Sequence, residues 1–297
     1  MNAPPQSISR PGHPTKVLRI GVRAHDFGRM PAAHLAARIA AKGFDCAQLA
    51  LNKAIPGLNL QAEDLNGKVA REIGDAFRRE GVEIAVLGCY INPIHPDSAV
   101  RRQLLGYFKD HLRFARDFGC GLVGLESGSL NADYSPHPGN QSEAAFATLL
   151  GSLEELVGTA DEFGVDVGLE AVTSHTVSTP EKMRRVLDCC RSPRLKVIFD
   201  PVNLLCAANA SRQSEIIGEA MELFGDRVAV VHAKDFLLES GVMRTVPAGC
   251  GQLDYGPVMS FIHRHTPATR VLLEETGETL AEECAGFLRQ KWLESDL

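Results

Sequence analysis

Four short apolar runs in the second half of the chain each end near a side chain that can bind a metal ion. The runs are VDVGLEAV, LKVIFDP, VAVVHAKD and RVLLEET, and the side chains are Glu170, Asp200, His232 and Glu274. One carboxylate at a strand end is more often a helix cap or a solvated loop residue. Four in succession are hard to explain in that way, so these residues predict a divalent-metal site.

The elements that must bring these side chains together are eight strand-like apolar runs that alternate with amphipathic segments. Glycines at positions 43, 81, 119, 164 and 225 follow those segments, where a left-handed residue ends a helix. Apolar spacing over residues 142–163 predicts one helix, and Thr179 before Pro180 predicts the start of another.

Eight strands alternating with helices predict the α/β class and a (β/α)₈ TIM barrel as a single domain over residues 17–297. Residues 1–16 are expected to form a flexible N-terminal leader. An open doubly wound sheet is the alternative. The barrel is favoured because its closure brings the ends of early and late strands to one mouth.

Composition bounds the function. The 297 residues are 44% hydrophobic and carry a formal charge of −6, which argues against nucleic acid as a partner. No apolar run has the length of a membrane span, so no membrane partner is expected. The eight cysteines form no CxxC pair, as expected of reduced thiols in a cytoplasmic protein.

The motifs GLEAV, FDPVNL, HAKD and LLEET, in that order, resemble the sugar phosphate isomerase/epimerase family, also called xylose isomerase-like TIM barrels. That family contains ketose 3-epimerases, hydroxypyruvate isomerases and inosose dehydratases, and it is related to endonuclease-IV type AP endonucleases. The resemblance covers residues 17 to about 290. It implies one divalent ion, Mn, Mg, Co or Zn, on the four residues found above, and it implies that Glu170 and Glu274 also move the proton.

Four further residues are candidates for the site. Lys234 follows His232 by two positions, so both side chains share one face, and it is expected to bind a substrate oxygen or to stabilise an enediolate. A lysine paired with a barrel carboxylate is an equal alternative. Asn203, Glu126 and His95 are expected to contact substrate, Glu126 because an acid that ends an apolar strand needs a partner.

Some residues are expected to be less important. Arg23, His25, Gln48 and Tyr90 are weaker candidates for the mouth of the barrel, and His175 for its rim. Glu275 is expected to face away from the site, because strand alternation opposes it to its neighbour. The remaining histidines are expected to be solvated, at positions 13, 34, 111, 137, 263 and 265.

The resulting functional prediction is a divalent-metal-dependent sugar isomerase or epimerase that removes a proton next to a carbonyl and passes through an enediolate. A keto-polyol dehydratase is the near alternative, and a barrel without catalysis is another. An AP-endonuclease-like phosphodiesterase is disfavoured, because Asn203 stands where many relatives have histidine. The expected partner is a sugar, a keto-polyol or a sugar phosphate, and a homo-oligomer is left open.

Overall fold

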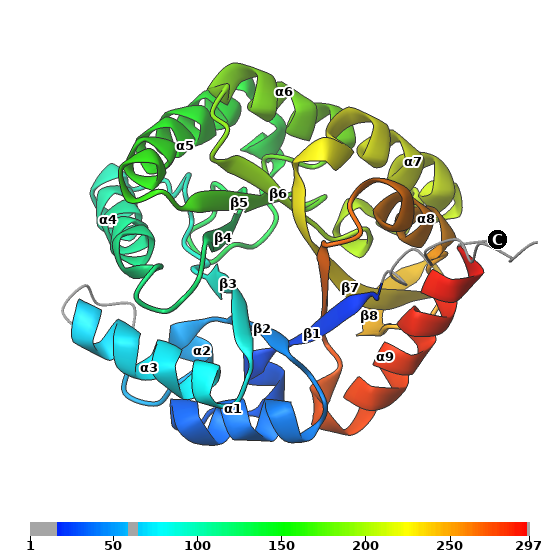
Figure 1. Ribbon diagram of the computed structural model, residues 1–297. Helices are drawn as coiled ribbons and strands as arrows, with labels where there is room; N and C mark the ends of the chain where they lie inside the picture. The colour runs from blue at the N-terminus through cyan, green and yellow to red at the C-terminus, as the bar shows by residue number, and fades with distance from the viewer. Residues whose placement is uncertain (1–16, 59–64, 296–297) are drawn as a thin grey trace, which may run out of the picture.

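The computed structural model describes residues 17–58 and 65–295, so the expected leader lies outside the described residues. Eight parallel strands close into a barrel, because β6 pairs with β7 as well as with β5. Helices surround the barrel on its outside (Figure 1). The predicted TIM barrel is therefore confirmed.

The strands have these bounds: β1 Arg19–Arg23, β2 Cys46–Leu49, β3 Glu83–Gly88, β4 Leu122–Glu126, β5 Asp166–Glu170, β6 Leu195–Phe199, β7 Val228–Glu239, β8 Val242–Pro247 and β9 Arg270–Leu273. The α-helices are α1 Ala32–Ala41, α2 Leu51–Ala54, α3 Gly67–Arg79, α4 Ser98–Phe114, α5 Glu143–Phe163, α6 Pro180–Cys190, α7 Gln213–Phe224, α8 Gly256–His265 and α9 Gly277–Glu294. Among the helices of the described ranges, none combines the length and apolar composition that a membrane crossing needs.

Side-chain alternation along the strands fills the barrel in layers. One apolar layer lies inside the barrel and consists of Cys46, Val86, Leu122, Ile198, Val230 and Leu272. Two positions further along four of these strands, the side chains are polar: Gln48, Asp200, His232 and Glu274. Since strand residues i and i+2 share a face, the fold directs this polar layer into the barrel at the C-terminal ends of the strands.

Glycine makes room for these layers at β5. A Cβ added at Gly168 would lie 2.8 Å from the Cγ1 atom of Ile198, which is closer than packed side chains allow. Glu170, two residues later, shares the inward face with Gly168 and reaches the polar layer.

The predicted helix starts are confirmed. The Ser142 side chain accepts a hydrogen bond from the backbone N–H of Ala145 and caps α5, and Thr179 caps α6 through the N–H of Lys182. Four of the five predicted left-handed glycines are confirmed, at positions 43, 81, 119 and 164. Gly225 is the exception, with a φ of −57°. A Cβ there would lie 2.2 Å from the ring of Phe261, so close packing explains this glycine.

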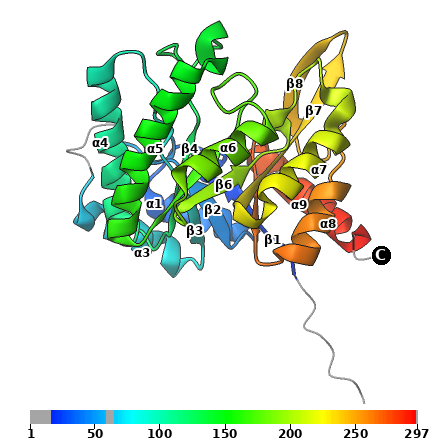
Figure 2. The same cartoon turned by 90° about the horizontal axis from the view of Figure 1, so that it is seen from above.

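A ninth strand was not predicted. β7 continues well past His232, and β8 returns beside it as an antiparallel hairpin, with Lys234 opposite Pro247. Figure 2 shows this hairpin rising beyond the ends of the other strands. Most of β8 is exposed or half-buried, so it lacks the continuous apolar pattern by which the barrel strands were recognised.

Candidate active site

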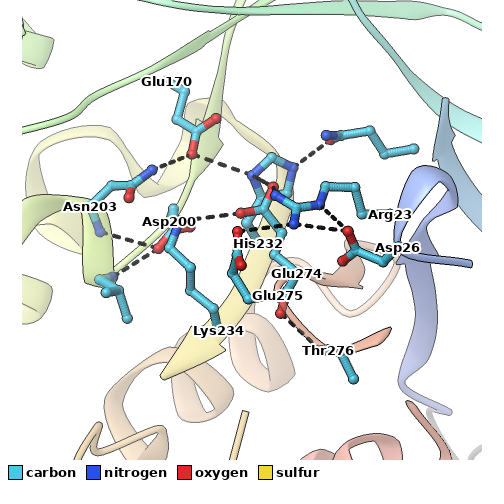
Figure 3. Close-up of polar contacts among 12 residues, drawn as sticks. Arg23, Asp26, Glu170, Asp200, Asn203, His232, Lys234, Glu274, Glu275 and Thr276 are labelled. Carbon is cyan, nitrogen blue, oxygen red and sulfur yellow. Dashed lines mark hydrogen bonds and ion pairs between the residues drawn. The ribbon is translucent and has the colours of Figure 1, made fainter. Parts of the chain in front are cut away.

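The four predicted metal ligands converge in the polar layer of the barrel (Figure 3). Each is at least 95% buried. Glu170, Asp200 and His232 each offer a ligand atom, and these atoms lie within 4.8 Å of one another. Glu274 lies beside them, with its Oε1 atom 3.3 Å from His232 Nδ1.

His232 is held on both sides of its ring. Nδ1 lies 3.3 Å from Glu170 Oε1 as well as from Glu274, and Nε2 lies 2.6 Å from Gln48 Oε1. Burial acts to lower the pKa of this imidazole, but the charges of Glu274, Glu170 and Asp200 outweigh burial and raise the pKa to about 9. In the absence of an ion, the ring is therefore a cation among carboxylates.

Lys234 supplies a second positive charge. Its ammonium lies 2.8 Å from Asp200 Oδ2 and 3.2 Å from Glu274 Oε2. Burial acts to lower its pKa, but these carboxylates and Glu170 outweigh it and raise the pKa above its usual range.

The pKa values of the two carboxyl groups that contact Lys234 are shifted in opposite directions. Burial raises the pKa of Asp200 to about 6, although Lys234 opposes the shift. Burial also acts to raise the pKa of Glu274, but His232, Lys234 and Arg23 outweigh it and hold the pKa well below its usual range.

The donor set fits a divalent cation. Three carboxylates and one imidazole are ligands that Mg²⁺, Mn²⁺, Co²⁺ or Zn²⁺ accept, in differing degrees. Asp200 Oδ2 is buried and accepts no hydrogen bond from the described groups, although the Lys234 ammonium is close to it. This oxygen is paired with the ammonium at 2.8 Å, and its remaining lone pairs can bind a cation.

A cavity of about 230 Å³ opens above this polar layer. Its lining comprises Arg23, His25, Lys53, Tyr90, Glu126, Glu170, Val172, His175, Asn203, Lys234, Glu274 and Glu275. Asn203 Nδ2 donates to Glu170 Oε1 at 2.7 Å, so the asparagine holds one carboxylate in place.

A match to a family model decides where the chain belongs. Residues 36–291 match the model described as xylose isomerase-like TIM barrel. The chain belongs to this family. A comparison with curated proteins found no match.

Solved structures similar to this xylose isomerase-like barrel include a D-tagatose 3-epimerase-like protein, with a TM-score of 0.75, 18% identity and coverage of 94% of this chain and 98% of the other. The 3-keto-D-glucoside 4-epimerase of E. coli has a TM-score of 0.72 and 17% identity, over 92% and 100% of the two chains. A family protein from Mycobacterium smegmatis in complex with magnesium has a TM-score of 0.67 and 14% identity, over 94% and 97% of the two chains. The likeness shows the fold, and sugar epimerases are among the similar structures.

Glu126 and His95, two predicted substrate contacts, differ in their placement in this xylose isomerase-like barrel. Glu126 lines the cavity, and its Oε2 atom lies 3.5 Å from Nδ1 of His175. Burial, followed by the charge of Glu170, raises the pKa of Glu126 to about 7. His95 is not among the lining residues. Its ring accepts the backbone N–H of Asp97 at 3.2 Å, in the turn that leads into α4.

The expectation for Glu275 is wrong. Strand β9 ends at Leu273, and Glu275 has a left-handed backbone with a φ of 53°, so strand alternation no longer applies. Its side chain lines the cavity and accepts a hydrogen bond of 3.0 Å from Arg23. Arg23 also contacts Asp26 at 2.9 Å and Glu274 at 3.7 Å, so this arginine joins the carboxylates on one side of the cavity.

Several polar residues of the cavity had only a weak sequence signal. Lys53 was not singled out, although it stands among the first residues after the second strand, and its ammonium lies 4.9 Å from the centre of the Tyr90 ring. Burial lowers the pKa of both His25 and His175 to about 4, so both rings are neutral near pH 7. The expectation of a solvated His111 is wrong, because this residue is 1% exposed and lies on the buried side of α4.

Proposed function

We propose that the chain is a divalent-metal-dependent sugar isomerase or epimerase that moves a proton next to a carbonyl through an enediolate. The observation that carries this proposal is the pair of carboxylates around His232. Glu170 ends β5 and Glu274 directly follows β9, with β6 and β7 between these strands in the barrel. Each glutamate places Oε1 3.3 Å from the same imidazole nitrogen. Two carboxylates that approach one centre from different sides can act on opposite faces of one carbon.

A cation held by Glu170, Asp200, His232 and Glu274 would supply Lewis acidity, which weakens a C–H bond between a hydroxyl and a carbonyl. The side chains would transfer the proton and stabilise the charge that develops. Glu274 is ionised because nearby cations lower its pKa. Its carboxylate is therefore in the form that can take up a proton, although the low pKa makes it a weak base. The Lys234 ammonium can stabilise negative charge on a substrate oxygen.

The direct test uses deuterium. Enzyme treated with EDTA and reloaded with Mn²⁺, Mg²⁺, Co²⁺ or Zn²⁺ is incubated in D₂O with ketoses, their phosphates, inosose and hydroxypyruvate, and each substrate is followed by NMR. We expect deuterium at the carbon next to the carbonyl of one substrate, in a metal-dependent reaction. If no compound exchanges with any metal although the metal is bound, the proposal fails.

A keto-polyol dehydratase is the second candidate, and Glu126 favours it. Dehydration needs an acid that protonates the departing hydroxyl after the C–H bond breaks. Glu126 lines the same cavity, and with a pKa of about 7 it can carry that proton near neutral pH. Loss of water from inosose in the same panel, abolished in Glu126→Gln, would select this reaction over epimerisation.

A phosphodiesterase acting on abasic DNA has less support. Three residues after Asp200, where many relatives have histidine, this chain has Asn203, an amide that donates to Glu170 and is a poor metal ligand. The cavity has a volume of about 230 Å³, which suits a small molecule, and the formal charge of −6 on the chain gives no general attraction for a nucleic acid. We therefore propose a small-molecule partner, a sugar, keto-polyol or sugar phosphate, for a cytoplasmic enzyme.

A further inference from the structure

Gln48 is a buried amide that touches both the candidate metal centre and the wall of the cavity. It lies in β2 and is 0% exposed. Its Oε1 atom lies 2.6 Å from Nε2 of His232, and its Nε2 atom donates to the hydroxyl of Tyr90 at 2.5 Å. Both ends of the amide are therefore occupied, one by a predicted ligand and the other by a residue that lines the cavity.

The local structure directs Gln48 toward these partners. The pairing of β2 with β3 shifts by one residue between Ala47 and Gln48, and such irregularities re-aim side chains. Cys46, two positions earlier, belongs to the apolar layer inside the barrel, so Gln48 reaches the polar layer above it. A buried amide at this point costs free energy unless its partners satisfy it.

The surroundings of Nδ1 in His232 decide which atom donates in the hydrogen bond between Nε2 and Gln48. Nδ1 faces the oxygens of Glu170 and Glu274, so Nδ1 is the nitrogen that would bind a cation. A neutral imidazole that binds through Nδ1 carries its only proton on Nε2. That N–H requires an acceptor, and the carbonyl oxygen of Gln48 lies at hydrogen-bond distance.

The same orientation sets the role of Tyr90. Because the carbonyl end of Gln48 faces His232, the amide N–H end faces Tyr90, whose oxygen accepts. The proton of the Tyr90 hydroxyl is then directed elsewhere, and among the described residues no group accepts it. Tyr90 lines the cavity, so the hydroxyl can donate to a ligand there.

We propose that Gln48 is a positioning residue, which fixes His232 with its proton on Nε2 and leaves the Tyr90 hydroxyl as a donor to a substrate oxygen. The claim about His232 concerns metal binding by the ligand residues alone. The claim about Tyr90 rests on the proposed function. Groups that orient a ligating histidine in this way raise metal affinity, typically by about 10–100-fold.

Two substitutions at position 48 separate the two contacts. Gln48→Met removes the acceptor and the donor together. Gln48→Glu keeps an acceptor for His232, but a carboxylate also accepts the proton of Tyr90 and turns that hydroxyl away from the cavity. Tyr90→Phe removes the hydroxyl alone. Asn140→Leu is the control, since Asn140 is a buried amide whose hydrogen bonds go to Ser129, Leu130 and Ser174.

Affinity for Mn²⁺ is measured by calorimetry, and the His232 ring is followed by ¹⁵N NMR in Mg²⁺-loaded, ¹⁵N-histidine-labelled protein. We expect Gln48→Met to weaken Mn²⁺ binding about 10–100-fold and to lose the slowly exchanging Nε2–H signal. Gln48→Glu should retain both, and Asn140→Leu should bind Mn²⁺ as the wild type does. Unchanged affinity and signal in Gln48→Met would overturn the assignment, as would a Gln48→Glu protein that loses Mn²⁺ to the same extent.

Kinetics test the second contact. With a substrate found in the deuterium panel, Gln48→Glu and Tyr90→Phe should each raise KM by a similar factor, and the double variant should add little. A Gln48→Glu enzyme with the wild-type KM would refute the role of Tyr90. If no sugar is turned over while Gln48→Met still weakens Mn²⁺, the proposed function and the Tyr90 part fail, and the part on His232 holds.

Discussion

Replacement of Lys234 tests the charge balance of the site. The ammonium lies 2.8 Å from Asp200 and 3.2 Å from Glu274, and all three side chains are at most 10% exposed. At an effective dielectric constant of about 20, each pair attracts by roughly 5 kcal/mol before the cost of dehydration is counted. Because removal of one partner leaves the other charge buried and uncompensated, such changes typically cost about 3–5 kcal/mol.

We therefore expect Lys234→Met to lower the free energy of unfolding by about 3–5 kcal/mol in EDTA. In excess Mn²⁺ the loss should be smaller, because a bound cation supplies replacement charge to the same carboxylates. The measurement is urea unfolding followed by circular dichroism, with and without the metal. Lys53→Met is the control, because Lys53 lines the same cavity but is exposed and makes no ion pair with a described residue.

Two results would refute this reasoning. A Lys234→Met protein as stable as the wild type in EDTA would mean that the buried carboxylates do not depend on the ammonium. A loss of equal size with and without Mn²⁺ would mean that the cation does not bind near Asp200 and Glu274.

Four further predictions concern individual residues. Glu274→Gln should slow deuterium exchange by about 10²–10⁴-fold at matched metal content, and retained exchange would transfer the role to Glu275. Asn203→Ala should cost roughly 1–3 kcal/mol in kcat/KM with little change in Mn²⁺ affinity, and a loss of metal with unchanged kinetics would place Asn203 among the ligands. Because His232 has a pKa of about 9 and must lose its proton to bind metal, Mn²⁺ affinity should rise about tenfold per pH unit between pH 6 and 9; a flat calorimetric profile would contradict this. Burial lowers the pKa of His111 from 6.5 to about 4, so below pH 6.5 the unfolded chain binds a proton that the native chain rejects. Acidification from pH 6.5 to 4 should therefore remove about 3 kcal/mol of stability, and urea unfolding of His111→Gln should lack this part of the loss.

The barrel and the convergence of the four ligands could be predicted because both depend on short-range rules. Apolar runs with glycine-ended helices fix the order of elements, and alternation of side chains fixes which strand residues face inward. Glu170, Asp200, His232 and Glu274 all follow that rule, and their side chains do meet. Their roles in metal binding and catalysis stay predictions.

The remaining features depend on contacts that the sequence does not encode locally. Glu275 reaches the cavity because its left-handed backbone ends the alternation of β9. Gly225 is required by the ring of Phe261, which comes from a distant helix. Gln48 could be recognised only as a polar residue in a buried strand, because its partners come from β7 and from the loop after β3.

The charges in the polar layer explain why a divalent cation suits this barrel. Among the described residues, Glu170, Asp200 and Glu274 face two inner cations, the protonated His232 and Lys234. Arg23 also lies 3.7 Å from Glu274, but its charge is shared with Asp26 and Glu275, which are nearer. Without an ion, this group has one negative charge in excess, which is costly in a buried space. Exchange of the His232 proton for a divalent ion brings the charges into balance, whereas a monovalent ion would leave the excess in place. A neutral sugar, the substrate that we propose, would then meet a balanced centre, and Lys234 would offset negative charge that develops on the sugar's oxygens.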